Sequence, residues 1–303
     1  MRVVLDDLKS PIERIAALVP ASLERIAPER SVDLAPHFPQ LTLHFVAERK
    51  FRAQINPETG EITVSALFLE VAWALAYSYH VFHMKVLNTP LWNGQEVDLK
   101  ADSEVTAAMA LLAWAIGAIE NGNSWPAGAP SPEAEPQSAT IEFGAQQLCL
   151  GAMGVILQHE LAHKYLSHRK PQPPDDSWTL EAERDADASA VSWVLDSNTC
   201  PPQQFTFRAM SVAIAFLLFV ARSIHTGDYG GLTHPRTFDR LFHALKEYLD
   251  PDEAVVWGFV GGILLLHMRY MKIFPPTQEY QRFYDFVDAC IERLATEWQR
   301  TQQ

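Results

Sequence analysis

The sequence predicts a mainly α-helical protein with a small β-element. Segments without proline that carry apolar residues at helical spacing fill most of the chain after residue 64. Short segments with the character of β-strands occur only between residues 41 and 64. Hydrophobic residues make up 48% of the 303 residues, which is enough for a substantial core.

The amino-terminal part supplies the predicted β-element. Residues 1–30 predict one or two short helices, broken by three prolines. Residues 41–47 and 51–56 predict strands, and a turn at residues 57–60 leads to an extended segment at residues 62–64. This small sheet could align an extended peptide by strand addition, or it could be a structural meander that contacts no substrate. The sequence leaves both interpretations open.

The next two predicted helices differ in burial. Residues 64–87 are apolar on nearly every side, so this helix is expected in the core. Glu70 within it needs a partner, which could be an internal ion pair or a polar group beside a functional site. Asp102 or Ser103 begins the following helix, and a loop rich in Pro, Ala, Ser and Glu follows it at residues 123–140.

Charge and cysteine content argue against several kinds of partner. The net charge of −13 disfavours binding to a nucleic-acid backbone, which needs clustered Lys and Arg, and docking on an anionic membrane. The three cysteines are far apart and form no Cys-x-x-Cys pair, so neither a disulfide scaffold nor a cysteine-based zinc site is expected. These features suit a soluble cytoplasmic protein.

Two apolar runs, residues 209–221 and 254–266, require a test for membrane spans. Each contains 13 residues, whereas a helix needs about 20 apolar residues to cross a bilayer. Buried core helices are therefore expected, and stable membrane insertion is not. Peripheral membrane association is the alternative interpretation.

The run from His159 to His163, with the sequence His-Glu-Leu-Ala-His, lies on a predicted helix over residues 143–168. Two histidines four residues apart project from one helix face, so their ring nitrogens can bind one metal ion. Glu160 between them can take a proton from water beside that metal. The alternative is a pair of core histidines with ordinary hydrogen bonds, beside an ordinary helical glutamate.

A second predicted helix, at about residues 178–196, offers the third metal ligand. An N-cap for it is expected among residues 175–177. Glu183 and Asp187 fall within its apolar stripe, and a buried carboxylate needs a partner. Glu183 is the better ligand, whereas Asp187 is better placed to accept the ring N–H of a ligating histidine. The alternative is an internal salt bridge to Arg or Lys.

A third segment follows a glycine-rich turn. His234 and Pro235 end this turn, and a helix that begins after Pro235 carries Arg240 in its second turn. His234 or Arg240 could reach over the metal and stabilise an oxyanion, which would make both catalytic. Alternatively, His234 caps the turn and Arg240 pairs with Asp187 or Asp239.

These three segments together resemble the signature of gluzincin peptidases of the HtpX type: His159-Glu160-x-x-His163, Glu183-x-x-Ala186-Asp187 and His234-Pro235-x-x-x-x-Arg240. The resemblance implies a zincin-like metallopeptidase core. In it His159, His163 and Glu183 bind Zn²⁺, and Glu160 is the general base. Peptidases of the HtpX type have transmembrane helices, and this chain shows none that is convincing.

Other features are similar to the Lit-type phage-exclusion peptidases. These are the block at residues 51–62, a helix with Glu70, Trp73 and Tyr77, and the position of the His-Glu run near the middle of the chain. This resemblance implies a latent cytoplasmic bacterial protease, whose known relative cuts elongation factor Tu during phage infection. An activating peptide would suit such latency. No residue of this sequence identifies the substrate.

The sequence therefore predicts a zinc-dependent endopeptidase that hydrolyses peptide bonds in a protein or peptide substrate. One alternative is a non-catalytic zinc-binding protein or pseudo-peptidase scaffold, and another is a membrane-associated quality-control peptidase. Structural zinc sites usually have four protein ligands. Three candidate ligands with a base between the histidines favour the enzyme.

We predict a single domain over residues 1–303, because no internal repeat divides the chain. The main alternative is a division near residue 140. In that case an accessory region at residues 1–140 would precede a catalytic helical region at residues 141–303.

Overall fold

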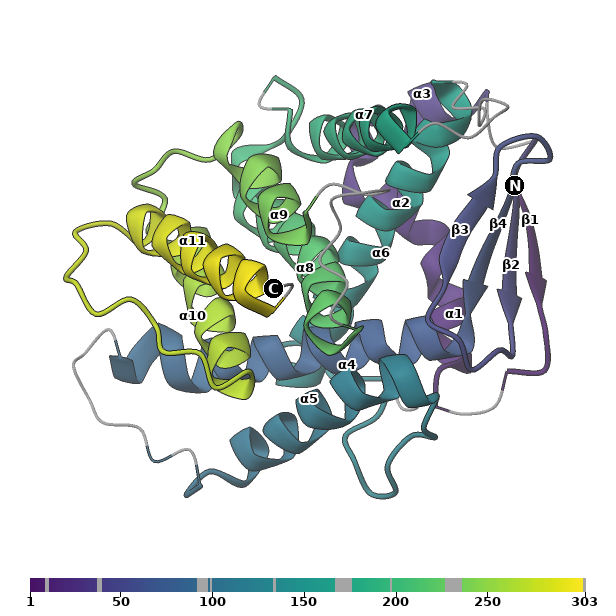
Figure 1. Ribbon diagram of the computed structural model, residues 1–303. Helices are drawn as coiled ribbons and strands as arrows, with labels where there is room; N and C mark the ends of the chain where they lie inside the picture. Colours follow the sequence, from purple (N-terminus) through teal and green to yellow (C-terminus); the bar gives the residue numbers. More distant parts are fainter. Residues whose placement is uncertain are drawn as a thin grey trace.

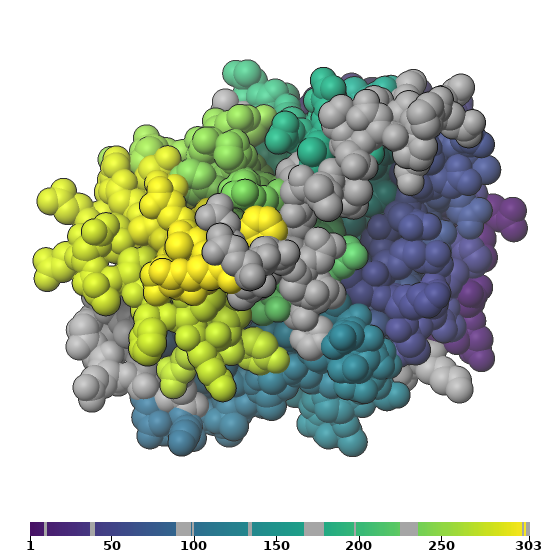
Figure 2. Space-filling model, in the orientation of Figure 1, coloured from purple at the N-terminus to yellow at the C-terminus, as the bar shows by residue number. Residues whose placement is uncertain are grey.

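The computed structural model describes residues 1–8, 11–36, 40–91, 98, 100–132, 135–166, 176–196, 198–226 and 236–301. Helices dominate these residues, and a four-stranded sheet lies on one side of the molecule (Figure 1). Figure 2 shows this sheet and the carboxy-terminal helices at opposite sides of the same face. The predicted fold class, mainly α with a small β-element, is confirmed. The single domain stays a prediction.

The sheet contains the strands β1 (Arg2–Leu5), β2 (Thr42–Val46), β3 (Ala53–Asn56) and β4 (Glu61–Ser65), in the spatial order β1-β2-β4-β3. β1, β2 and β4 are parallel, and β3 pairs with β4 in an antiparallel hairpin. The three predicted extended segments are therefore confirmed. Their arrangement places β3 at the edge of the sheet, beside the helix that carries the two histidines.

The strand β1 is a correction to the prediction, which placed only short helices in residues 1–30. β1 has four residues, and Val3 and Leu5 are 41% and 47% exposed. Such a short exposed segment has no informative pattern of burial. It is extended because it pairs with β2, where Arg2 lies opposite Thr42, and this partner is distant in the sequence.

Helical turns follow β1, as predicted. The segments are α1 (Glu13–Leu18), η1 (Val19–Ala21), α2 (Ser22–Ile26), η2 (Pro28–Arg30) and α3 (Ser31–Leu34). They are short because proline and non-helical backbone interrupt them, as at Ala27. The side chains of Ile15, Val19, Leu23 and Ile26 are buried and fix these turns against the core.

The helix α4 (Ala66–Phe82) lies in the centre of the molecule and continues as a π-helical segment, η4 (His83–Leu91). Ser65 caps its first turn, and every residue of α4 except His80 is buried. Glu70 forms an ion pair with Arg49 at 2.6 Å. Of the two kinds of partner considered for Glu70, the structure thus shows the internal ion pair.

The remaining helices pack on α4 or on one another. They are α5 (Ser103–Asn121), α6 (Ile141–Tyr165), α7 (Asp176–Leu195), α8 (Pro202–Thr226), α9 (Thr237–Lys246), α10 (Ala254–Tyr270) and α11 (Phe283–Thr301). Asp102 caps α5, and α5 ends at Gly122, whose φ of 62° is in the left-handed region that favours glycine. The helix α6 contacts α2, α4, α7 and α8, so it lies at the junction of the helical layers.

Two helices, α5 and α8, are long and apolar enough to cross a bilayer by length and composition. The apolar window of α8 is 78% buried within the protein, and that of α5 is 44% buried. The run at residues 209–221 lies within α8 and is almost wholly buried, and the run at residues 254–266 lies within α10 and is almost wholly buried beyond its first two residues. Such burial is that of core helices.

The buried contact between α4 and α10 predicts a stability that depends on pH. Tyr79 Oη lies 2.6 Å from His267 Nε2, and burial lowers the pKa of His267 to about 4. An unfolded histidine titrates near pH 6.5, so folding favours the neutral ring. The stabilisation should be complete above pH 6.5 and decline as the pH falls towards 4. It should be about 2 kcal/mol smaller at pH 5 than at pH 7.

Urea unfolding of the wild type and His267→Gln at both pH values measures this contribution. The variant should lose less stability on acidification. His243→Gln is the control, because His243 is an exposed residue of α9. An equal loss of stability in all three proteins would contradict the role of His267.

Candidate active site and metal centre

The helix α6 presents both histidines at its carboxyl end. Thr140 caps the helix, and its middle section is buried from Leu148 to Gln158. His159 and His163 follow one turn apart, with side chains that are 12% and 16% exposed. Their Nε2 atoms lie 3.2 Å apart. The helix therefore directs two ring nitrogens at the same point, as its four-residue spacing predicts.

The neighbouring helix α7 brings a carboxylate to that point. Glu183 Oε2 lies 3.5 Å from His159 Nε2, and Glu183 Oε1 lies 3.6 Å from His163 Nε2. Ligands of a tetrahedral zinc ion are separated by about 3.4 Å, given metal–ligand distances near 2.1 Å. His159, His163 and Glu183 thus offer a donor set whose composition and spacing fit zinc or a similar divalent ion.

Asp187 joins the histidine pair to α9. Its Oδ1 lies 2.9 Å from His159 Nδ1, and it receives two hydrogen bonds of 2.7 Å from Arg240. A carboxylate at Nδ1 fixes the tautomer that leaves Nε2 able to bind a metal. Arg240 also lies 3.7 Å from Glu183, so one guanidinium interacts with both acidic residues.

These contacts dominate the electrostatics of the buried site. Burial opposes charge on His159, but hydrogen bonds with Asp187 and Glu183 outweigh it and raise the pKa of His159 to about 10. Burial also acts against ionised Asp187, yet Arg240 and His159 lower its pKa to about 2. Asp187 therefore remains an anion at neutral pH, and it attracts positive charge to His159.

Glu160 lies beside the two histidines and is half-buried. Burial raises its pKa to about 7, although the positive charge on His159 acts in the opposite direction. Its Oε2 accepts a hydrogen bond of 2.7 Å from the backbone N–H of Ile55 on β3. The edge strand of the sheet thus reaches the carboxylate that the sequence identifies as the candidate base.

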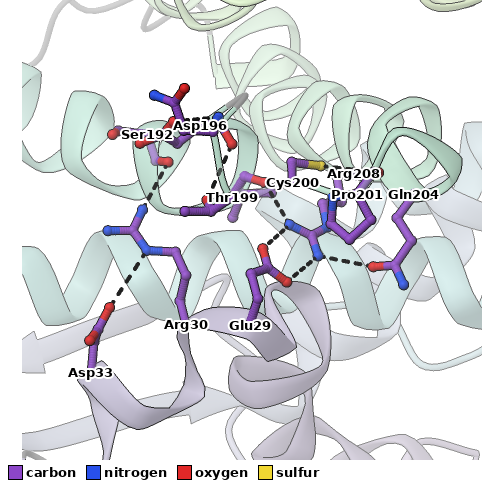
Figure 3. Close-up of polar contacts among 12 residues, drawn as sticks. Glu29, Arg30, Asp33, Ser192, Asp196, Thr199, Cys200, Pro201, Gln204 and Arg208 are labelled. Carbon is purple, nitrogen blue, oxygen red and sulfur yellow. Dashed lines mark hydrogen bonds and ion pairs between the residues drawn. The ribbon is translucent and has the colours of Figure 1, made fainter.

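The carboxyl end of α7 is fixed by the amino-terminal segment, as Figure 3 shows. Arg208, at 1% exposure, forms a two-point ion pair with Glu29 and donates to the carbonyl of Val194. Arg30 donates to the carbonyl of Ser192. Both carbonyls lie in the last turn of α7, where helical partners run out. The Ser192 carbonyl also accepts from the Asp196 N–H. The two arginines anchor the helix that carries Glu183 and Asp187.

A cavity of about 490 Å³ lies between α7 and α9. The ion pair of Asp187 and Arg240 forms part of its wall, so the cavity adjoins the histidine pair. Its apolar lining includes Leu180, Val191 and Ala244. The cavity has a size typical of small-ligand pockets.

The structure brings together most of the predicted site residues. His159, Glu160, His163, Glu183 and Asp187 form one cluster. Arg240 joins this cluster by pairing with Asp187. The sequence offered this ion pair as the alternative to a direct catalytic role for Arg240. His234 lies outside the described residues.

The sequence analysis missed three contributors to the geometry: Ile55, Glu29 and Arg208. Ile55 acts through its backbone N–H, which no side-chain pattern can reveal. Glu29 and Arg208 are distant in sequence, although Arg208 directly precedes the apolar part of a core helix. That position was a signal that this arginine needed a buried partner.

Sequence comparison places the chain among peptidases. The model of the family described as Peptidase U49 matches residues 62–260. The chain belongs to this family, and the expected resemblance to Lit-type peptidases is confirmed. A relative named cell death peptidase, from Escherichia coli (strain K12), is 26% identical over 278 residues. That alignment covers 88% of this chain and 92% of the relative. A comparison with solved structures finds no match.

We expect Glu183→Gln to weaken binding of a divalent metal by roughly 100-fold or more, because an amide is a poorer ligand than a carboxylate. Glu181→Gln is the matched control, because Glu181 is exposed on the same helix. Mass spectrometry after dialysis gives the metal content of both variants, and titration of the metal-free proteins gives their affinities for the metal. Equal affinities would remove Glu183 from the ligand set.

We expect Arg208→Ala to lower the free energy of unfolding by about 3 kcal/mol, because Glu29 loses its buried partner. Arg282→Ala is the control, because it removes an exposed two-point pair with Asp285. Urea unfolding should show a much smaller change for this variant. Similar losses in both variants would mean that Arg208 does not anchor α7.

Proposed function

We propose that the protein is a zinc-dependent endopeptidase of the gluzincin type. The observation that carries this proposal is the spacing of His159, His163 and Glu183, with Glu160 beside them. A zinc ion held there would supply Lewis acidity for a water molecule and a scissile carbonyl. Three protein ligands leave a coordination position for substrate, as in catalytic rather than structural zinc sites.

The surrounding side chains have separate roles in this proposal. Glu160 is the general base that takes a proton from the attacking water and passes it to the leaving amine. Asp187 orients His159, and Arg240 holds Asp187 in place through two hydrogen bonds. His234 remains a predicted contributor to oxyanion stabilisation, and Arg240 contributes through Asp187.

The edge strand β3 is suited to align a substrate. Arg52 and Asn56 direct their carbonyl oxygens towards the β4 side, where they accept from Ser65 and Gly60. Because backbone direction alternates along a strand, Ala53 and Ile55 direct their polar groups away from β4. An extended peptide could therefore add to this edge beside Glu160. We propose that the substrate is bound as such a strand.

The biological substrate is a finer part of the proposal. The Escherichia coli relative is named cell death peptidase, which joins proteolysis to cell death in that protein. Such an activity needs restraint, so we propose a latent enzyme that acts in phage defence and cleaves elongation factor Tu once triggered. An activating peptide is the trigger that we propose. We also propose a cytoplasmic location, because the proposed substrate is a translation factor.

We expect Glu160→Gln to retain zinc and to lose at least about 100-fold in the rate of peptide cleavage, because it removes the proton acceptor and keeps the ligands. Zinc content and the cleavage of purified elongation factor Tu, alone and in lysate from phage-infected bacteria, test this. Loss of zinc in the variant would contradict the assignment of Glu160 as base. A wild type that binds zinc but cleaves no protein in either setting would contradict the peptidase.

A further inference from the structure

The contact between β3 and Glu160 links two parts of the chain that are 105 residues apart. The Ile55 N–H donates to Glu160 Oε2 at 2.7 Å. Ile55 belongs to the edge strand, whereas Glu160 lies on α6 between the two histidines. The backbone of one element thus contacts the candidate base of another.

The register of the hairpin explains why this N–H is available. Arg52 and Asn56 accept hydrogen bonds from Ser65 and Gly60, so even-numbered residues of β3 face β4. The N–H of Ile55, an odd-numbered residue, therefore points away from the sheet. A donor on the open edge of a sheet needs another acceptor when it is shielded from water, and Glu160 supplies one.

A second contact holds the hairpin against the same end of α6. Gly60 closes the turn between β3 and β4 with a φ of 73°, in the left-handed region. A side chain at this position would collide with Lys164 Nζ and with the carbonyl of Gln40. The turn therefore packs closely on the residue that follows His163. Two contacts, at Ile55 and Gly60, fix the hairpin relative to the histidine pair.

We propose that the Ile55 N–H positions Glu160 for catalysis, an inference that rests on the proposed peptidase function. The hydrogen bond engages Oε2 and fixes the orientation of the carboxylate, so Oε1 is the more basic oxygen and the one proposed to take the proton. Fixed orientation of a base lowers the barrier because no reorganisation is needed during reaction. The strand that aligns the substrate thus also aligns the base.

Two other uses of this N–H make different predictions. If the N–H restrained Glu160 and kept the enzyme latent, its removal would accelerate cleavage. If substrate displaced Glu160 and accepted this N–H itself, its removal would raise KM and leave kcat unchanged. Positioning alone requires a lower kcat with an unchanged KM and unchanged affinity for zinc.

Replacement of the amide before residue 55 by an ester removes this donor and keeps the Ile55 side chain. An ester before residue 53 is the matched control, because the Ala53 N–H also faces the open edge. Each ester also weakens the carbonyl of the preceding residue, which is Gln54 for the ester at 55 and Arg52 for the ester at 53. Both of these carbonyls face β4. The comparison therefore isolates the Ile55 N–H. Ile55→Pro and Ala53→Pro form a second pair, because proline is tolerated where an edge-strand N–H points away from the sheet.

We expect the ester at 55 to lower kcat by about 10- to 100-fold relative to the ester at 53, with KM and zinc affinity unchanged. Elongation factor Tu and a quenched fluorescent peptide library are the substrates. Hydrogen exchange supplies a readout that needs no activity: the Ile55 amide should exchange more slowly than that of Ala53, and Glu160→Ala should remove the difference.

The outcomes separate this inference from the proposed function. A wild type that cleaves substrate, with equal or higher kcat in the ester at 55, overturns the positioning role alone. A raised KM with unchanged kcat also overturns it, in favour of substrate binding by the N–H. Equal exchange of the two amides in the wild type excludes the contact. A zinc-loaded wild type that cleaves neither substrate, alone or in lysate from phage-infected bacteria, overturns both the peptidase function and this inference.

Discussion

The structure depends on the carboxylate of Asp187 being held between His159 and Arg240. Burial of three ionisable groups in one place is costly unless each has a charged or hydrogen-bonded partner. Asp187 supplies that partner to both neighbours, at 2.9 Å and 2.7 Å. Because the three residues belong to α6, α7 and α9, the pairing sets how these helices pack. Any shift of α7 would break these two contacts of Asp187 and move Glu183 away from the histidines.

The sheet contributes through position rather than through side chains. β3 lies at its edge, so a backbone N–H remains for Glu160, and the turn at Gly60 packs on the end of α6. A central strand could not spare such an N–H, because both of its edges would be paired. The antiparallel return of β3 on an otherwise parallel sheet thus has a structural consequence: it brings an open strand edge to the histidine pair.

The helices and the candidate site could be predicted from sequence where the signal is local. The spacing of His159 and His163, and the inward position of Glu183 and Asp187 on one helix, are properties of helix geometry. The features that were not predicted depend on contacts between distant parts of the chain. β1 is extended only because β2 lies beside it, and the Ile55 N–H meets Glu160 only in the folded chain. The pairing of Arg240 with Asp187 stayed one of several alternatives because 53 residues separate them.

The balance of charge gives a separate argument for a divalent ion. Glu160, Glu183 and Asp187 bring three carboxylates to the described part of the site, and Arg240 brings one guanidinium. Three negative charges and one positive charge leave two negative charges in a buried region. Without an ion, Asp187 and Glu183 raise the pKa of His159 to about 10 against its burial, and burial raises the pKa of Glu160 to about 7, so both groups favour a bound proton. A bound Zn²⁺ would neutralise the sum, leave both rings neutral as ligands and allow Glu160 to ionise as a base.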